Sequence, residues 1–297
     1  MEKIGLVVEG GGMKCAYSSG ILDCFLDDQI RFDYIIGVSA GSSSAASYAA
    51  GQRGRNIRFY TTHTTEKGYF GFDSFLKTGD LFGLDYIYST LTNSDGADPI
   101  DYPAIVRNPA ELVAVATDAR TGLPHYFTKK DISQDHYEVF KASCALPAAC
   151  RPRFIKGVPY FDGGISDAIP ADHALREGGC SRVVVILTKP RDFVKQPEKF
   201  RPFYSVRCAK YPKVVEMLNN RHIIYTAEQK RIFELEKEGK AFIFAPSEHL
   251  AMDTYSMDIE ANKKLYQLGF HDYAAQKADL LRFLGLPTPD ADENRKA

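Results

Sequence analysis

The sequence predicts an α/β fold with a largely parallel central sheet, and three observations support this. The first fifty residues alternate between apolar runs typical of buried strands and segments with helical spacing, in the order strand, helix, strand, helix. Two further apolar runs, residues 182–188 and 241–245, predict strands in the second half of the chain. Residues 213–238 and 258–284 carry amphipathic patterns that predict long helices, the second region holding one or two of them.

Length and composition limit the classes of protein to consider. The 297 residues suffice for one large α/β domain or two small ones, and a net charge of -1 gives no reason to expect a nucleic-acid partner. No apolar run approaches the roughly 20 residues of a membrane span. The N-terminus leads directly into a predicted strand at residues 3–8 without the regions of a signal peptide, so we expect a cytoplasmic protein.

Cysteine and histidine usage gives no sign of a metal site. The six cysteines are scattered without a Cys-x-x-Cys pair, and the seven histidines form no His-Glu-x-x-His motif. We therefore expect reduced, mostly buried cysteines, no metal and no cofactor.

The first strand ends in a glycine-rich turn, Gly10-Gly11-Gly12, before a predicted helix. Consecutive glycines allow backbone N–H groups to converge on an anion, because no Cβ atoms stand in the way. The sequence Met13-Lys14-Cys15 that follows fits neither the dinucleotide fingerprint nor the Walker A loop. An oxyanion hole is the favoured interpretation, and a flexible strand–helix turn is the simpler alternative.

The second strand, Tyr34–Val38, runs into Gly37-x-Ser39-x-Gly41 and a series of small residues. Strand, tight turn and helix in this order are the context of a nucleophile elbow, which exposes a serine hydroxyl at a helix N-terminus. Taken alone, the pattern also fits a Gly/Ser turn. Because crossovers between parallel strands are right-handed, we expect the glycine turn and Ser39 side by side at the carboxyl edge of the sheet.

Residues 57–96 are rich in aromatic side chains and glycine. We expect an irregular excursion with a small core of its own, which can also form the wall of an acyl-chain pocket. Beyond it, residues 111–117 and 124–127 predict two connected strands, residues 137–145 predict a helix, and residues 154–161 predict a hairpin.

A third motif, Asp162-Gly163-Gly164, follows the last strand of this hairpin. It places a carboxylate on a loop with close backbone approach, although Asp-Gly turns are common for purely structural reasons.

Residues 189–213 combine basic and aromatic side chains. A solvated loop is the default prediction, and peripheral contact with anionic lipid is the alternative. The tail from Pro287 onward is rich in Pro, Asp and Glu, and predicts disorder.

Taken in this order, the three motifs resemble the patatin-like phospholipase family. Residues 142–147, Ala-Ser-Cys-Ala-Leu-Pro, also resemble a segment that helps to shape that family's active site. The resemblance runs from about residue 4 to 190, and the last third of the chain carries no recognised motif. Three positions depart from the family pattern, namely Lys14, Cys15 and Asp167.

The resemblance implies a three-layer α/β/α sandwich with a patatin-like core at 1–190, a C-terminal strand and helices at 191–286 packed on it, and a disordered tail at 287–297. It implies a serine esterase that hydrolyses lipid acyl esters, of phospholipase A or lysophospholipase type, through an acyl-enzyme. Ser39 would be the nucleophile and Asp162 the base. Backbone N–H groups of Gly10, Gly11 and Gly12 would form the oxyanion hole.

Two other interpretations remain open. One is an α/β-hydrolase with a Ser-His-Asp triad, for which His173, His222 or His249 could serve. The other is a non-catalytic lipid-binding protein of the same fold. The sequence also leaves the substrate open among phospholipid, lysophospholipid, neutral glyceride and thioester.

Overall fold

A mixed sheet forms the centre of the molecule. The computed structural model describes residues 2–147, 149–199, 201–249 and 257–288. Within these residues the sheet has eight strands in the order β5-β6-β3-β2-β1-β7-β8, and β4 pairs with β3. The strands are β1 Ile4–Val8, β2 Tyr34–Val38, β3 Glu111–Asp118, β4 Pro124–Thr128, β5 Arg153–Ile155, β6 Val158–Asp162, β7 Arg182–Ile186 and β8 Ala241–Phe244.

Five neighbouring strands, from β3 through β2, β1 and β7 to β8, are parallel, whereas β4, β5 and β6 pair antiparallel. The predicted largely parallel sheet is therefore confirmed. In the register of β1 and β2, Val8 lies opposite Gly37, so the two strands end at the same edge. The turns that follow them therefore begin next to each other.

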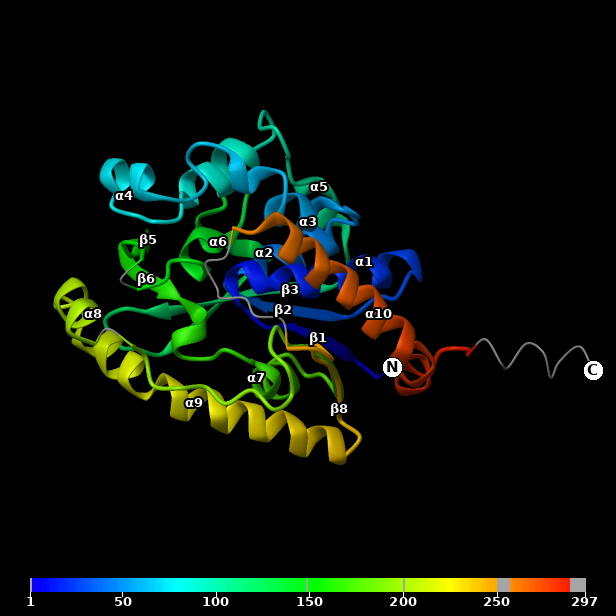
Figure 1. The fold of residues 1–297 in the computed structure, drawn as a ribbon. Coiled ribbons are helices and arrows are strands. Elements are labelled where there is room, and N and C mark those ends of the chain that lie inside the picture. Colours follow the sequence, from blue (N-terminus) through cyan, green and yellow to red (C-terminus); the bar gives the residue numbers. More distant parts are fainter. Residues whose placement is uncertain (1, 148, 200, 250–256, 289–297) are drawn as a thin grey trace, which may run out of the picture.

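Helices cover both faces of the sheet, which gives the three layers α/β/α (Figure 1). Side chains alternate along β1, with Leu6 and Val8 in one core and Val7 in the other. Helices α1, α2 and α10 lie on the first face, and α7 and most of α9 on the second. The helices are α1 Cys15–Asp27, α2 Ala40–Ala49, α3 Arg55–Tyr60, α4 Phe72–Thr78, α5 Tyr102–Arg107, α6 Glu138–Ser143, α7 Ala171–Arg176, α8 Arg201–Arg207, α9 Pro212–Lys237 and α10 Ile259–Leu284.

The last third of the chain adds elements to every layer. Strand β8 extends the parallel sheet beside β7, and α10 packs along α1. The two helices nearly touch at Gly20, where a Cβ atom would come within 2.3 Å of the Tyr266 carbonyl oxygen. Nearby, the Tyr17 hydroxyl donates to Asp272 Oδ2 at 3.0 Å.

Two regions contain more regular structure than expected. Residues 189–213, predicted to be a loop, include α8, where Pro202 occupies the first turn that tolerates proline. Residues 57–96, predicted to be irregular, include most of α3, all of α4 and a π-helix at Tyr86–Leu91. In both cases the helices are too short for their apolar spacing to be recognised. Residues 258–284, for which one or two helices were expected, form one helix.

The predicted disordered tail falls mostly on residues 289–297, which lie outside the described residues. Among the described helices, none combines the length and the apolar character needed to cross a bilayer.

Candidate active site

Ser39 occupies the sharp turn between β2 and α2. Its backbone has a φ of 54° and a ψ of -134°, an uncommon conformation for a residue with a side chain. The glycines on either side allow close approach. A Cβ atom at Gly41 would lie 2.5 Å from the Val8 carbonyl oxygen, and one at Gly37 would lie 2.5 Å from the Ser42 Cα atom. The turn therefore rests directly on the end of β1.

The Ser39 side chain meets Asp162, which lies 123 residues further along the chain. Ser39 Oγ donates a hydrogen bond to Asp162 Oδ2 at 2.5 Å, and both side chains are buried. The other carboxylate oxygen, Oδ1, accepts the backbone N–H of Gly164 at 2.8 Å. Asp162 comes from the end of β6, which pairs with β3, and β3 in turn pairs with β2. The order of strands thus brings together two residues that are distant in sequence.

Burial raises the pKa of Asp162 above its ordinary value. Several contacts oppose this effect without cancelling it. They are the positive charge of Arg221, the hydrogen bonds from Ser39 and from the Gly164 N–H, and the positive charge of Lys189. A carboxylate with a raised pKa accepts a proton more readily, which is the property required of a base.

The glycine turn lies against Ser39. A Cβ atom at Gly10 would come within 2.8 Å of Ser39 Cβ and 2.7 Å of the Val38 carbonyl oxygen. Gly12 has a φ of 56° and begins a 3₁₀ turn that leads into α1. Within the part of the chain that the structure describes, the N–H groups of Gly10, Gly11 and Gly12 donate to no protein oxygen. These donors remain available to a ligand beside Ser39.

A buried cluster fixes the base of the glycine turn. Glu9 accepts hydrogen bonds from the Thr188 N–H at 2.6 Å and from the Thr188 hydroxyl at 3.0 Å, and it also pairs with Lys189. The Thr188 hydroxyl lies 2.8 Å from the Gly10 carbonyl oxygen. The end of β7 therefore supports the turn from the side opposite to β2.

The segment at residues 142–147 links the two halves of the site. Ser143 Oγ accepts the N–H of Ser39 at 2.9 Å and donates to the Val115 carbonyl oxygen at 2.6 Å. The Ala145 carbonyl oxygen accepts the N–H of Asp162 at 2.9 Å. Since the N–H of Ser39 is already bonded, it is not free to join an oxyanion hole.

A largely apolar cavity opens on the α2 side of Ser39. We call it the apolar cavity, and several aromatic residues from the 57–96 region line it. They include Phe59, Tyr60, Tyr69, Phe82 and Tyr88. This region therefore forms both a packed excursion and the wall of a cavity that reaches Ser39.

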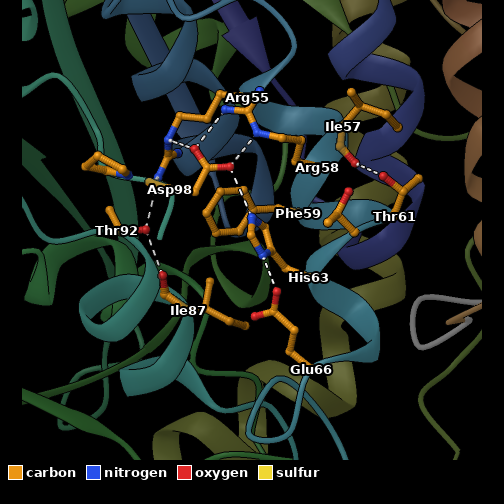
Figure 2. A network of polar contacts seen from close by, with 12 residues as sticks. Arg55, Ile57, Arg58, Phe59, Thr61, His63, Glu66, Ile87, Thr92 and Asp98 are labelled. Carbon is orange, nitrogen blue, oxygen red and sulfur yellow. Dashed lines mark hydrogen bonds and ion pairs between the residues drawn. The ribbon is translucent and has the colours of Figure 1, made fainter. Parts of the chain in front are cut away.

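A network of charged side chains centred on Asp98 lies beside the apolar cavity, which Arg55 lines (Figure 2). Arg58 holds both carboxylate oxygens of Asp98 at 2.6 and 2.8 Å, and His63 Nε2 lies 3.1 Å from Oδ2. Arg55, only 4% exposed, lines the cavity and donates to Thr92 and to the Asp98 carbonyl oxygen. Burial lowers the pKa of Arg55 to about 10, although the charge of Asp98 acts in the opposite direction. The network ties α3 to residues 92–98.

A second cavity lies on the other side of Ser39, toward α9, and we call it the polar cavity. Asp162 and the glycine turn form part of its wall. Three basic and two acidic side chains complete it, namely Lys189, Lys195, Arg221, Glu9 and Glu198. Glu198 accepts hydrogen bonds from Lys195 at 2.6 Å and from Arg221 at 3.0 Å. The two cavities share Ser39, Gly12 and Leu146, so they meet at the serine.

Within the described residues, no histidine lines either cavity. His173 on α7 stacks on the Tyr126 ring, with the ring centroids 3.4 Å apart. His249 pairs with Asp192 at the surface, and its side chain is 70% exposed. The side chain that Ser39 contacts is thus a carboxylate, which disfavours the triad arrangement. Among the described residues, no group of three or more His, Cys, Asp or Glu side chains could hold a metal ion.

The structure brings together all five residues that the sequence motifs singled out: Ser39, Asp162, Gly10, Gly11 and Gly12. The motifs did not single out Thr188 and Lys189, although Thr188 ends a predicted strand and Lys189 follows it, at the edge where the motifs end. It also missed Arg221, which lies in the middle of a long helix where no local pattern marks it.

Comparisons with known proteins identify the family of this chain. Residues 6–175 match the sequence model of the patatin-like phospholipase family, and residues 211–285 match a domain of unknown function (DUF6363). A protein of Escherichia coli (strain K12), described as uncharacterized protein YjjU, is 27% identical over 270 residues, which are 90% of this chain and 75% of that protein.

VipD from Legionella pneumophila is a similar solved structure, with a TM-score of 0.47 and 14% sequence identity. The match covers 93% of this chain but only 66% of that chain's length. The family match itself covers more than half of the present sequence. This chain therefore belongs to the patatin-like phospholipase family.

Proposed function

We propose that the protein is a serine esterase that hydrolyses lipid acyl esters with a Ser39–Asp162 dyad. The observation that carries the proposal is the buried 2.5 Å hydrogen bond from Ser39 Oγ to Asp162 Oδ2. It lies next to N–H groups of the glycine turn that have no partner among the described residues. A nucleophile with its base within hydrogen-bond reach is the general requirement for covalent acyl transfer.

In the first half-reaction, Ser39 Oγ attacks the ester carbonyl carbon while Asp162 takes the hydroxyl proton. The carbonyl oxygen becomes an oxyanion, and the N–H groups of Gly10, Gly11 and Gly12 stabilise it. When the tetrahedral intermediate collapses, the bond to the alcohol oxygen breaks. The leaving alkoxide receives the proton from Asp162, and the acyl group remains on Ser39.

In the second half-reaction, a water molecule replaces the alcohol. Asp162 takes a proton from the water as its oxygen attacks the acyl carbon, and the same donors hold the new oxyanion. Collapse of this intermediate releases the carboxylic acid, and Asp162 returns its proton to Ser39 Oγ. No imidazole is needed, because the carboxylate contacts the hydroxyl directly.

The two cavities suggest how an acyl ester would lie. The apolar cavity suits an acyl chain, and the polar cavity suits the alcohol or head group that leaves. This arrangement is typical of a substrate with one long apolar arm and one polar arm, as in phospholipase A or lysophospholipase chemistry.

Hydrolysis of a short-chain p-nitrophenyl ester tests the proposal, with the wild type beside Ser39→Ala and Asp162→Asn. We expect both variants to lose activity by orders of magnitude, and a fluorophosphonate probe to label the wild type at Ser39. An active Asp162→Asn together with an inactive histidine variant would instead identify a triad enzyme. A wild type that neither hydrolyses the ester nor takes up the probe would favour the non-catalytic lipid-binding interpretation.

We also propose that the protein contacts anionic membranes through α8 and its neighbours. Phe203 and Val206 on α8 are 58% and 79% exposed, and Lys199 and Arg201 beside them are exposed as well. Apolar side chains bordered by basic ones are the composition that anionic lipid surfaces attract. Arg207 is not available for this role, because it donates to the Gly79 carbonyl oxygen and lies over the Phe75 ring.

Co-sedimentation with vesicles tests this second proposal. We expect binding to anionic vesicles that weakens when Lys199 and Arg201 are changed to Glu, or when Phe203 and Val206 are changed to Asp. Binding that is unaffected by both pairs of changes would refute it.

A further inference from the structure

Arg221 is one of two residues of α9, with Tyr225, that line the polar cavity of the candidate active site. Its Nε donates to the Gly164 carbonyl oxygen at 2.7 Å, and its Nη1 donates to Glu198 Oε1 at 3.0 Å. The side chain is 24% exposed and lines the polar cavity together with Ser39 and Asp162. Arg221 lies in residues 211–285, outside the stretch that matches the catalytic family.

The carbonyl group that Arg221 holds belongs to the loop that orients the base. Gly164 donates its N–H to Asp162 Oδ1 and accepts Arg221 Nε at its oxygen, so one residue connects the two side chains. Asp162 Oδ2 then remains directed at Ser39. A guanidinium suits this role because its planar fork holds the Gly164 carbonyl and the Glu198 carboxylate at once in a fixed geometry.

Arg221 also places a positive charge near a carboxylate that is almost fully buried. Among the contacts that favour the ionised form of Asp162, the charge of Arg221 has the largest effect. Other titratable side chains lie near Asp162. Lys189, after β7, also favours the ionised carboxylate. Lys195 and Glu198 before α8 and Glu9 after β1 line the same cavity, and the thiols of Cys15, Cys144 and Cys150 interact with the Asp162 charge.

We propose that Arg221 is a positioning residue for the catalytic base, and that the C-terminal segment therefore completes the active site. Arg221 holds the Asp162-Gly163-Gly164 loop through the Gly164 carbonyl group and supplies the positive charge beside the Asp162 carboxylate. This inference rests on the proposed function, because it gives Arg221 a role only if Asp162 acts as the base. It assigns to the domain of unknown function a part in the chemistry at Ser39.

The rate at which a fluorophosphonate probe labels Ser39, measured across the acidic pH range, tests the inference. Labelling requires ionised Asp162, so its rate falls as the pH drops through the pKa of that carboxyl. We call this fall in the labelling rate at low pH the acidic limb. In Arg221→Gln we expect the acidic limb to move to higher pH by about one unit, because the nearby positive charge is lost. Arg221→Lys keeps the charge but loses the fork, so it should restore most of the limb position while the maximal rate stays reduced.

Two further variants separate this effect from a general loss of structure. Arg231→Gln alters an arginine on the same helix that pairs with Asp172 at the surface, and it should leave the limb at its wild-type position. Glu198→Gln keeps a hydrogen-bond acceptor for Arg221 but removes a negative charge from the polar cavity. It should move the limb to lower pH, a direction that destabilisation of the fold does not explain.

The outcomes distinguish the inference from the function on which it rests. Absence of labelling in the wild type, or full labelling in Asp162→Asn, would refute the dyad itself. Normal labelling in the wild type with the same acidic limb in Arg221→Gln and Arg231→Gln would refute only the role of Arg221. If Arg221→Gln does not fold, a wild-type maximal labelling rate in Arg221→Lys together with an unchanged pH dependence in Glu198→Gln would refute that role equally.

Discussion

The apolar cavity and the polar cavity share Ser39, but different parts of the chain line them. Residues from α2 and the 57–96 excursion enclose the first, whereas the end of β7 and helix α9 enclose much of the second. Arg55, which lines the apolar cavity, pairs with the buried Asp98. Glu228, by contrast, is a partly buried carboxylate on α9, the helix that contributes Arg221 and Tyr225 to the polar cavity. The environments of these two carboxylates are opposite.

Burial alone would raise the pKa of Asp98. Hydrogen bonds from Arg58 and His63, together with the charge of Arg55, outweigh it and hold the pKa below its ordinary value. Glu228 on α9 has no cation bonded to it and accepts only the N–H groups of Ala168 and Ile169 within the described chain. Burial and, second, the charge of Asp167 raise the pKa of Glu228 to about 8.

The charged groups around the two cavities are therefore stabilised in different ways. Beside the apolar cavity, the charged side chains pair with one another, which leaves aromatic surface for an acyl chain. On the α9 side, Glu228 has no bonded cation among the described residues, and the basic side chains Lys189, Lys195 and Arg221 line the polar cavity instead. Three predictions test this contrast.

The largest effect is expected beside Ser39, at Gly10. In Gly10→Ala the new Cβ atom would lie 2.7 Å from the Val38 carbonyl oxygen, so the glycine turn must shift. Since loss of one oxyanion donor costs about 10²–10³ in kcat, we expect a fall of that size in the kcat for ester hydrolysis. The fall should be the same for short and long acyl chains.

Gly5→Ala on the same strand is the matched control. Its Cβ atom would meet the movable Cys180 Sγ at 3.0 Å, so activity should change little. A Gly10→Ala enzyme with near wild-type kcat would show that the glycine turn does not stabilise the oxyanion.

A smaller and more selective effect is expected from Ser43→Leu. Ser43 lies on α2 one turn after Ser39 and lines the apolar cavity, where Tyr88 donates to it at 3.2 Å. A leucine there would shorten the space for a chain. We expect kcat/KM for long-chain esters to fall about tenfold or more relative to short-chain esters.

The corresponding change on the other side is Lys195→Gln, which lines only the polar cavity. It should leave the ratio of long-chain to short-chain kcat/KM unchanged. If Lys195→Gln alters this ratio and Ser43→Leu does not, the assignment of the acyl chain to the apolar cavity is wrong.

The smallest effect concerns stability and pH on the α9 side. The folded-state pKa of Glu228, about 8, lies above its ordinary value of 4.5, so the folded protein holds this proton more tightly than the unfolded chain. The protonated carboxyl therefore favours folding at low pH, and that stability is lost as the pH rises from about 4.5 to about 8. In Glu228→Gln we expect the Tm above this range to exceed that of the wild type by about a few degrees.

Thermal melts of both proteins across this pH range would test the prediction. Glu216→Gln, an exposed change on the same helix that pairs with Lys213, is the control and should follow the wild type. A Glu228→Gln variant that melts below the wild type at every pH would show that its ionised form is well accommodated.

The sequence was sufficient for the elements whose signals are local. The apolar run at residues 34–38 has the same first and last residues as strand β2. The glycines around Ser39 predicted the turn, because only small residues permit such close backbone approach. The contact between Ser39 and Asp162 is different. It depends on β6 pairing with β3 in addition to the adjacent β5, and no single segment encodes that pairing.

The missed residues are those whose role depends on distant packing. Arg221 looks like any other arginine on an amphipathic helix until α9 is placed across the Asp162 loop. Helix α8 has Pro202 in its first turn, but its seven residues are too few for a helical spacing to be recognised. Asp167, noted as a departure from the family, accepts the Tyr126 hydroxyl at 2.7 Å, and burial raises its pKa to about 6.

The close crossing of α1 and α10 bears on how the protein is made. Tyr17 and Asp272, which bond across this crossing, are 255 residues apart in the chain. During synthesis, the face of α1 that carries Gly20 stays uncovered until α10 has left the ribosome. The segment that follows the glycine turn therefore cannot complete its packing as it emerges, and the active site matures only after nearly all of the described fold has been translated.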